Sequence, residues 1–317
     1  MNILHPLLNP ILALFLAPLL PGIINRTKAI VAGRTGQPLL QLYYDLFRLF
    51  QKSAVYSLTV SPIFKAGPLV GLACIVMGLT LVPMGGIPSL FGFAGDLVVL
   101  AYLMGLARFF TVAAALDTGS AFEGMGASRE VQFSVLAEPA LLLGLAAISQ
   151  VGLIRPLTAL PTAIPLESLS EMLARLSMSV WMADGTVLLL TSAALFIVML
   201  AENCRIPVDD PTTHLELTMI HEVMVLDHSG PDFGMILYAA ALKLWIFLAL
   251  LAGLLIPVRT GNFWMDGASI LIGMVVIAIG IGVIESINGR LRLIRVPQLL
   301  AGALVLSVMA LVMVLWG

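Results

Sequence analysis

Repeated apolar segments of about 20 residues constrain this 317-residue chain more than any other feature. A helix rises about 1.5 Å per residue, so such a segment can cross the ~30 Å hydrocarbon core of a bilayer. Eight apolar runs are bounded by charged residues or by Gly and Pro, at 2–22, 67–87, 95–115, 131–153, 178–201, 235–257, 267–287 and 298–316. In lipid the backbone hydrogen bonds must close within each segment, which favours helices. We therefore expect an all-α integral membrane protein with about eight transmembrane helices, forming one polytopic domain over 1–317.

Composition excludes several other classes of protein. Apolar residues make up 60% of the chain and charged residues only 11%, whereas a soluble domain carries about 25% charge. The net charge of −2 offers no basic surface to nucleic-acid phosphates. Cys74 and Cys204 form neither a CxxC pair nor a ligand cluster, so we expect no iron–sulfur or zinc centre on cysteines of this chain. The bilayer is the first partner that the composition predicts.

The first apolar run differs from a secretory signal peptide. It lacks a Lys or Arg before the apolar stretch and has no clear cleavage site of small residues. Pro6, Pro10, Pro18 and Pro21 lie within it, and prolines bend helices. We expect a retained and kinked first span.

The stretch 25–66, between the first two spans, carries several cations and cannot cross the membrane. Leu42, Leu46 and Leu49 recur at helical spacing, while Asp45 and Arg48 occupy another face. This pattern predicts an amphipathic helix near 39–52 that lies on the membrane surface after the first span.

The cations fall mainly on one side of the predicted membrane. Eleven lie in the loops 25–66, 116–130, 202–234 and 288–297, whereas only Arg155, Arg175 and Arg259 lie on the other side. Cytoplasmic loops carry the excess of Lys and Arg. We therefore expect these four loops to face the cytoplasm and both termini to face outward, in the inner (cytoplasmic) membrane of a cell.

Ionisable residues within or at the edges of the spans are candidates for function, because an unpaired charge there costs from ~2.5 to above 10 kcal/mol. They are Asp96, Arg108, Glu138, Asp184, Lys243 and Glu285. A structural ion pair or a snorkelling side chain explains any single one, most readily Asp96 and Asp184 at the outer ends. Six together favour a buried polar path. Lys243 and Glu285 have depths that allow a direct or water-mediated link, although either can instead pair with Arg108 or Glu138.

The predicted loop 116–130 is rich in Gly, Ser and Ala and bears Asp117, Glu123, Arg129 and Glu130. No strand precedes it and it lacks the Gly-Lys-Ser/Thr of a phosphate-binding loop. Glu130 lies eight residues before Glu138, which is about 80° of net rotation on a helix. A proton can step between two such carboxylates through water.

The loop 202–234 is the most polar part of the chain. A metal site from its residues His214, His221, Glu222 and His228 is conceivable, but the spacing is not HExxH and no cysteine supports it. Histidines exposed to water or contacting a partner explain the pattern better. We expect no metal site.

Several motifs together resemble one family. They are Arg34-Thr35-Gly36 with Gln41, Asp45 and Arg48-Leu49; Ala107-Arg108-Phe109-Phe110; the stretch from Leu116 to Glu130; and Ala201-Glu202-Asn203 followed by Arg205, Pro207 and Asp209. This pattern resembles NADH dehydrogenase subunit 1, the complex I membrane subunit beside the quinone chamber. It is most similar to the branch found in membrane-bound group 4 NiFe hydrogenases, which includes formate hydrogenlyase subunit 4 and hydrogenase-4 component C. The resemblance runs from about residue 5 to the end.

The resemblance implies roles for individual residues. The family's carboxylates fall on Glu123, Glu130, Glu138, Glu202, Asp209, Glu216 and Glu222, and its basic partners on Arg34, Arg108, Arg129 and Arg205. We assign Glu130, Glu138, Glu202, Lys243, Glu285 and Arg108 to a proton pathway. The docking interface is expected to comprise Arg34, Asp45, Asp117, Glu123, Arg129, Arg205, Asp209, Glu216 and Glu222. The chain departs from the family in two places. The proline of the family's Arg-x-Gly-Pro turn falls one position later, at Pro38, and two carboxylates of the family's acidic run are replaced by Thr212 and His214. Quinone chemistry is therefore not implied.

The function implied by the resemblance is that of a non-catalytic subunit of an oxidoreductase complex. It would anchor a cytoplasmic electron-transfer module and link it to proton or sodium translocation. Its partners would be hydrogenase-like large and small subunits, carrying the Ni-Fe and iron–sulfur centres, and antiporter-like membrane subunits. Two alternatives remain: a stand-alone proton-coupled secondary transporter, which no inverted repeat supports, and a purely structural anchor, which leaves the ionisable residues inside the spans unexplained.

Overall fold

The chain folds as an assembly of helices in the computed structural model, which describes residues 4–85, 87–151, 167–209 and 219–316. The helices are α1 (Leu4–Leu16), α2 (Leu19–Val31), α3 (Gln41–Phe50), α4 (Pro62–Leu81), α5 (Asp96–Asp117), α6 (Ala121–Gln150), α7 (Leu169–Arg175), α8 (Met178–Glu202), α9 (Gly230–Leu255), α10 (Phe263–Ile287) and α11 (Val296–Trp316). Two short 3-10 helices, η1 (Glu222–Val225) and η2 (Leu293–Arg295), complete the described elements. The predicted all-α class is confirmed.

The number of membrane-length helices also agrees with the sequence. Seven helices of the described residues are long and apolar enough to cross a bilayer, and the total is eight when α1 and α2, which meet at a bend of 48°, are counted together as one span. The break falls at Ala17–Pro18, so the predicted kink is confirmed. The expected end of this span is wrong, because helix α2 continues through Val31 into the predicted loop. Lys28, within that continuation, is accommodated by an ion pair with Glu285.

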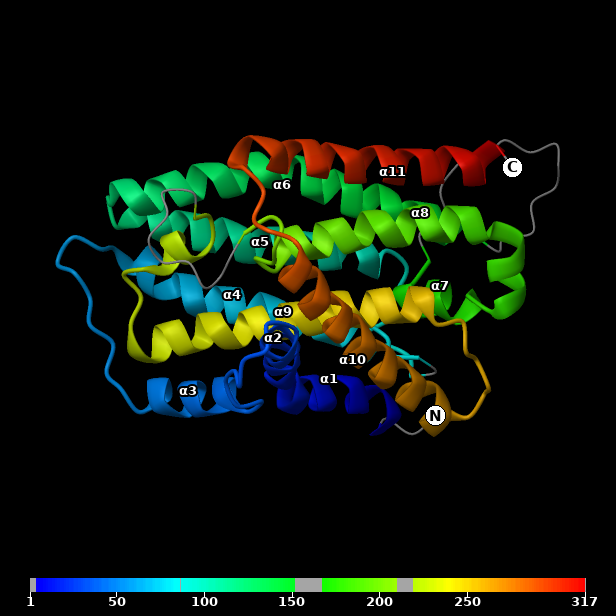
Figure 1. The fold of residues 1–317 in the computed structure, drawn as a ribbon, viewed down its shortest axis with the longest axis horizontal. Coiled ribbons are helices and arrows are strands. Elements are labelled where there is room, and N and C mark those ends of the chain that lie inside the picture. Colours follow the sequence, from blue (N-terminus) through cyan, green and yellow to red (C-terminus); the bar gives the residue numbers. More distant parts are fainter. Residues whose placement is uncertain (1–3, 86, 152–166, 210–218, 317) are drawn as a thin grey trace.

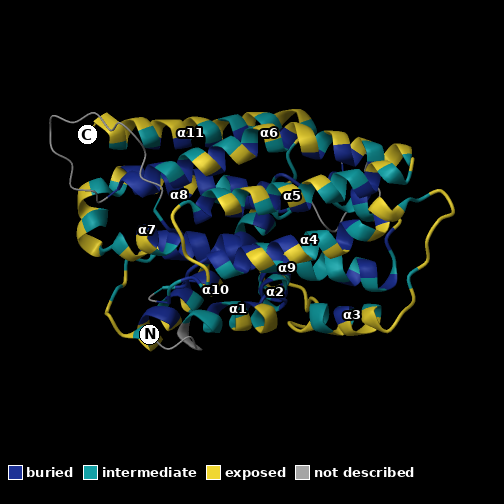
Figure 2. Ribbon diagram, turned by 180° about the vertical axis from the view of Figure 1, so that it is seen from behind, coloured by how far each residue is buried: buried dark blue, intermediate teal, exposed yellow. Residues whose placement is uncertain are grey.

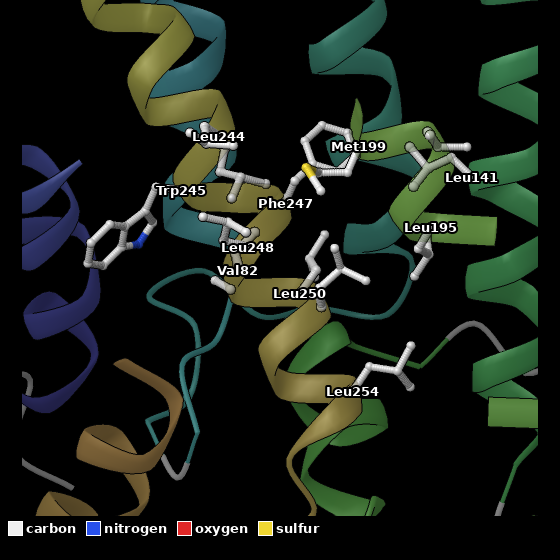
Figure 3. Close-up of a cluster of buried hydrophobic side chains, with 14 of the residues drawn as sticks. Val82, Leu141, Leu195, Met199, Leu244, Trp245, Phe247, Leu248, Leu250 and Leu254 are labelled. Carbon is white, nitrogen blue, oxygen red and sulfur yellow. The ribbon is translucent and has the colours of Figure 1, made fainter. Parts of the chain in front are cut away.

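Helix α9 lies at the centre of the assembly (Figures 1 and 2). Its sequence is apolar all round apart from Asp232 and Lys243, and a helix of that kind is stable only when surrounded. Leu248 and Leu254 are fully buried, and Figure 3 shows several of its side chains in the main hydrophobic cluster. Trp245 donates its indole N–H to Asn9, which joins α9 to α1. The surrounding helices are therefore packed around α9.

The segment 121–130 forms the first three turns of α6 and is not the loop that we expected. Its glycines suggested a turn, but Gly126 makes room for another segment: a Cβ there would lie 2.7 Å from the carbonyl oxygen of Ile220 and 2.3 Å from Val223. Packing against η1 thus overrides the low helix propensity of glycine. At 30 residues α6 is about 45 Å long, so it extends beyond the hydrocarbon at one end.

The predicted surface helix is confirmed as α3, which packs against α9. Leu46 is buried, while Tyr44 and Phe47 are exposed. We did not expect α7, which follows a capping box made by Ser168 and Glu171.

The two ends of the assembly differ in character. In Figure 1 the labelled N and C ends both lie at the end that carries α7, as an even number of spans requires. The opposite end carries α3, the connection from α3 to α4 and the start of α6. Helix α10 crosses the assembly at a steep angle and packs against α2 and α9.

Candidate functional site

A buried arginine on α5 gathers three carboxylates from two other helices. The side chain of Arg108 is 8% exposed, and its Nε donates to Oε1 of Glu130 on α6 at 3.0 Å. Its two Nη atoms donate to Glu138 on α6 and to Glu202 at the end of α8. One guanidinium thus bridges α5, α6 and α8. The structure brings together four residues that the sequence assigned to a proton pathway.

Lys243 extends this cluster to the central helix α9. Its Nζ lies 2.6 Å from Oε2 of Glu202, so Glu202 joins two cations. The suggested direct link between Lys243 and Glu285 is therefore wrong. Glu285, whose side chain is fully buried, instead pairs with Lys28 at 2.9 Å and with Arg205 at 3.6 Å. The difference arises because α10 crosses the assembly beside α2, a crossing that the depth of each residue in its span does not reveal.

A second branch leads from the helices into the 203–229 connection. His221 places Nε2 3.1 Å from Oε2 of Glu130 and Nδ1 3.4 Å from Oδ2 of Asp209. The other oxygen of Asp209 accepts from Arg290 at 2.9 Å. We call this set of eight residues the Arg108 network; it comprises Glu138, Arg108, Glu202, Lys243, Glu130, His221, Asp209 and Arg290.

The charge of the Arg108 network depends on one imidazole. Four carboxylates face three permanent cations, so the network carries one negative charge when His221 is neutral and none when it is protonated. Burial alone lowers the pKa of His221, but Cys204 and the carboxylates of Glu130 and Asp209 outweigh it, so the pKa lies well above 6.5. Burial opposes charge on Asp209 too, yet His221 and Arg290 hold the pKa of Asp209 below its usual value. We therefore take His221 as protonated at neutral pH.

Two openings give the Arg108 network access to its surroundings. A small cleft reaches it, lined by Glu130, Phe133, Ser134, Ala137, Ala201, Glu202, Val208 and His221. In addition, the side chain of Glu138 is 47% exposed, although it lies about 18 Å from the Gln150 end of α6 and thus within the expected hydrocarbon. Through Glu138 the Arg108 network thus reaches the side surface of the molecule.

The residues expected to dock a partner divide into surface and buried groups. Arg34 is exposed, Asp45 is half-buried and Glu222 is half-buried. Asp117 and Arg129 are also half-buried and hold neighbouring backbone: Asp117 accepts from Ser61 N at 2.7 Å, and Arg129 donates to Met219 O at 2.9 Å. The remaining described members, Glu123, Arg205 and Asp209, are buried. Glu216 lies outside the described residues.

The α3–α4 connection, the residues before α9 and the start of α6 are contiguous at one end of the molecule. Ser229, which precedes α9, bonds to both backbone groups of Val55 in the connection after α3. The N–H of Asp227 donates to Glu123 in the first turn of α6 at 3.2 Å. The contacts thus link the α3–α4 connection, the residues before α9 and the start of α6 into one surface.

Asp96 and Asp184, which the sequence predicts at the outer ends of their spans, lie apart from the Arg108 network. Asp96 is buried, and its Oδ1 accepts from Leu169 N at 2.8 Å, which ties α5 to α7. Asp184 lies at a break in α8, where its φ of −110° and ψ of 23° are not helical. Neither residue joins the Arg108 network.

Sequence reasoning did not assign His221, Arg290 or Lys28 to the pathway. The sequence offers His221 as a conceivable metal ligand; among the described residues no group of three or more His, Cys, Asp or Glu side chains has a geometry that holds a metal ion. For two of them the sequence does hold a signal: Lys28 and Arg290 are cations that lie within one or two helical turns of an apolar run, where they can reach a buried carboxylate. The distribution of charge along the sequence identifies both residues only as cations that flank the membrane.

The chain is similar in sequence to known proteins over most of its length. The family model described as NADH dehydrogenase matches residues 5–316. Formate hydrogenlyase subunit 4 of Escherichia coli (strain K12) is 30% identical over 305 residues, covering 94% of each chain. Hydrogenase-4 component C of the same organism is 30% identical over 255 residues, covering 80% of this chain and 76% of the relative.

A solved structure shares the fold. A chain of the membrane-bound sulfane sulfur reductase, an archaeal respiratory membrane complex, aligns with a TM-score of 0.78 at 20% identity, covering 99% of this chain and 100% of that chain. The family match over nearly the whole chain and the two relatives identify the protein as a multi-pass membrane protein that belongs to the NADH dehydrogenase subunit 1 family.

Proposed function

We propose that this chain is the membrane subunit of a complex I-like respiratory complex of the group 4 hydrogenase type. It anchors a cytoplasmic electron-transfer module and couples it to the translocation of protons or sodium ions. The chain itself is non-catalytic, and Ni-Fe and iron–sulfur centres belong to its hydrogenase-like large and small partner subunits. Both termini face outward and the end with α3 faces the cytoplasm.

The observation that carries this proposal is the Arg108 network. It runs from Asp209 and His221, outside the spans, to Glu202, Glu138 and Lys243 within them. Buried ion pairs of this kind contribute little to stability compared with packed apolar residues. A continuous set of titratable groups from the cytoplasmic end into the spans is what proton transfer requires.

The mechanism follows from the shared cations. Glu202 joins Arg108 to Lys243, so a proton taken up at Glu202 frees one cation to pair more tightly with Glu130 or Glu138. An added negative charge in a docked module favours protonation of nearby carboxylates, because like charges disfavour the ionised form. Redox changes outside the membrane would thereby shift protons within it, and this coupling is reciprocal.

A lateral partner completes the proposal. A carboxylate that is half exposed at membrane depth is not tolerated against lipid. The exposed side of Glu138, together with Val135 on α6 and Phe109 on α5, therefore fits an antiporter-like membrane subunit that offers a hydrogen-bonding group to Glu138. Protons would leave the Arg108 network across this contact.

Replacement of Glu202 by Gln tests the coupling role. The variant keeps the shape and hydrogen bonding of the side chain but cannot titrate. We therefore expect the purified complex to assemble, while the number of protons translocated per electron falls about tenfold or more. This loss is smaller than the ~100-fold commonly lost when a general acid–base group is removed. Asp184→Asn is the matched control, because Asp184 lies on the same helix outside the Arg108 network. Unchanged translocation in Glu202→Gln, with full turnover, would contradict the proposal.

Purification separates the proposal from the transporter alternative. A coupling subunit isolates with a soluble module that contains nickel or iron, which metal analysis detects. A stand-alone secondary transporter isolates by itself and transports its solute without any redox partner. The second result would overturn the proposed function.

A further inference from the structure

A second group of buried titratable side chains lies outside the Arg108 network. It consists of Glu123 in the first turn of α6, His228 before α9 and Asp232 in the first turn of α9, which are 0%, 7% and 7% exposed. Glu123 Oε2, His228 Nδ1 and Asp232 Oδ2 each lack a hydrogen-bond partner among the described residues. A buried polar atom without a partner costs about 1–3 kcal/mol. Three of them in one region are not explained by stability.

The three side chains converge on the dipeptide Asp227-His228. Glu123 Oε1 accepts the N–H of Asp227 at 3.2 Å. The imidazole of His228 stacks on the buried ring of Phe64, with centroids 4.0 Å apart and planes 9° apart, and it also interacts electrostatically with Asp232. This arrangement connects α4, α6 and α9 at the end of the molecule that we assign to the cytoplasm.

Tyr56 connects this group to water. Its hydroxyl interacts with Asp232, and its ring is partly exposed beneath the ammonium of Lys65, 4.6 Å from the ring centroid. The titratable groups of this region come from several elements, and most of them are acids. They are Tyr56 before α4, Lys65 on α4, Asp117 on α5, Glu123 on α6, Asp227 and His228 before α9, and Asp232 on α9. Burial lowers the pKa of His228, so its imidazole is neutral at neutral pH and can accept a proton.

Helix α6 aligns this group with the Arg108 network. Glu123 and Glu130 are seven residues apart, which is about 20° short of two full turns, so they share a face about 10.5 Å apart along the axis. Both contact the segment that contains η1: Glu123 meets Asp227 and Glu130 meets His221. Ala127 and Met224 pack between them with Ala115. The two groups are neighbours separated by a thin apolar contact.

We propose that Glu123, His228 and Asp232 form a proton-uptake site that supplies the Arg108 network from the cytoplasm. A proton from water near Tyr56 binds to Asp232 or to His228 Nδ1, moves to Glu123 Oε2 and passes to Glu130 when water enters between Ala127 and Met224. Each group then returns to its starting protonation state, and no electron is exchanged. The apolar contact lets the site hold a proton without equilibrating freely with Glu130. The inference rests on the proposed function of the Arg108 network.

Carbodiimide labelling tests whether these carboxylates bind protons while shielded from bulk water. Dicyclohexylcarbodiimide reacts with protonated carboxyls in apolar surroundings. In membrane vesicles containing the intact complex, we expect mass spectrometry to find the adduct on Glu123 or Asp232, with labelling that declines as the pH rises. Asp227, which is exposed, is the internal control and remains unlabelled. Absence of label from both Glu123 and Asp232 at acidic and neutral pH would overturn the inference.

Variants test the direction of transfer. In the double variant Glu123→Gln/Asp232→Asn we expect proton uptake by the intact complex to fall about tenfold at alkaline pH and less at acidic pH, where protons are abundant; this loss is below that of a general acid–base group. Asp184→Asn removes a carboxylate from α8, outside both groups of titratable residues, and retains the wild-type rate. Wild-type uptake in the double variant together with uncoupling in Glu202→Gln rejects the uptake site but retains the proposed function. Wild-type behaviour in both rejects the proposed function as well.

A single substitution decides the matter if the double variant does not assemble. His228→Phe keeps a ring stacked on Phe64 and removes only the titratable nitrogen. We expect it to assemble and to slow proton uptake at alkaline pH. An unchanged pH profile of uptake would count against the site.

Discussion

At the scale of single residues, His221 decides the charge of the Arg108 network. Its imidazole lies between Glu130 and Asp209 and bridges α6 to the connection after α8. The carboxylates pair with permanent cations, so the imidazole is the member whose charge changes most easily near neutral pH. One proton there converts a negatively charged network into a neutral one.

We predict that His221→Gln lowers stability in a pH-dependent way. The raised pKa of His221 means that protonation stabilises the folded protein. This stabilisation is complete below the unfolded-state pKa of about 6.5 and is lost as the pH rises through the higher folded-state pKa. Thermal unfolding of the purified protein at several pH values should give a gap of a few degrees between wild type and variant at acidic pH, narrowing at alkaline pH.

His228 supplies a control with the opposite sign. Its pKa is lowered by burial, so its contribution is present above about pH 6.5 and is lost as the pH falls through the folded-state value. His228→Phe is therefore expected to gain resistance to acid. Identical pH profiles for His221→Gln and wild type would mean that His221 is not charged in the folded protein.

At the scale of helices, the crossing of α10 over α2 positions the second cluster of charges. Gly282 allows this close approach, because a Cβ there would lie 2.7 Å from Cβ of Thr27 and 2.9 Å from the carbonyl oxygen of Ile24. The same contact brings Lys28 to Glu285, one turn further along α10. The absence of a side chain at Gly282 thus allows the ion pair between Lys28 and Glu285 to form.

We predict that Gly282→Ala separates α10 from α2 and destabilises the protein by about 1–3 kcal/mol, the usual range for overpacking. Gly280→Ala is the matched control, since no heavy atom lies within 4 Å of a Cβ at that position, and alanine there improves helix propensity. The measurement is the thermal unfolding midpoint of each variant. Equal midpoints for the two variants would argue against a tight α2–α10 contact.

At the scale of the whole molecule, the two ends have different contents. The end with α3 holds the contiguous segments around Val55, Asp227 and Glu123 and both groups of titratable residues. At the end with α7, Arg259 donates to the carbonyl oxygens of Leu173 and Gly253, and Arg175 pairs with Glu167. This asymmetry favours docking of a soluble module at the α3 end.

We predict that the double variant Arg34→Glu/Arg48→Glu weakens retention of the soluble module about tenfold, because reversed charges at a docking surface repel the partner. Both residues are exposed at the α3 end. Arg292→Glu, an exposed reversal in the connection between α10 and α11, is the control and should leave retention unchanged. Co-purification in increasing salt measures the effect. Full retention in the double variant would place the docking surface elsewhere.

The sequence by itself determined the membrane class, the number of spans and the surface helix, because lipid requires long apolar segments and amphipathic periodicity is local. It also predicted that Arg108 and Lys243 face the interior of the helix assembly, whereas the side chain of Glu138 is 47% exposed. Helix ends were less predictable: the glycines before Glu130 suggested a loop, but Gly126 packs closely against Ile220 and Val223, more than 90 residues away in sequence, and the segment is helical.

Only the tertiary structure decided which charges meet. Lys243 pairs with Glu202 rather than Glu285, and Glu285 pairs with Lys28, because helix crossings and not depth in the membrane set the partners. Burial of Glu123 and Asp209 likewise depends on segments distant in sequence folding over them. A membrane sequence specifies its spans through local hydrophobicity, whereas ion pairing within a few ångströms depends on how those spans pack.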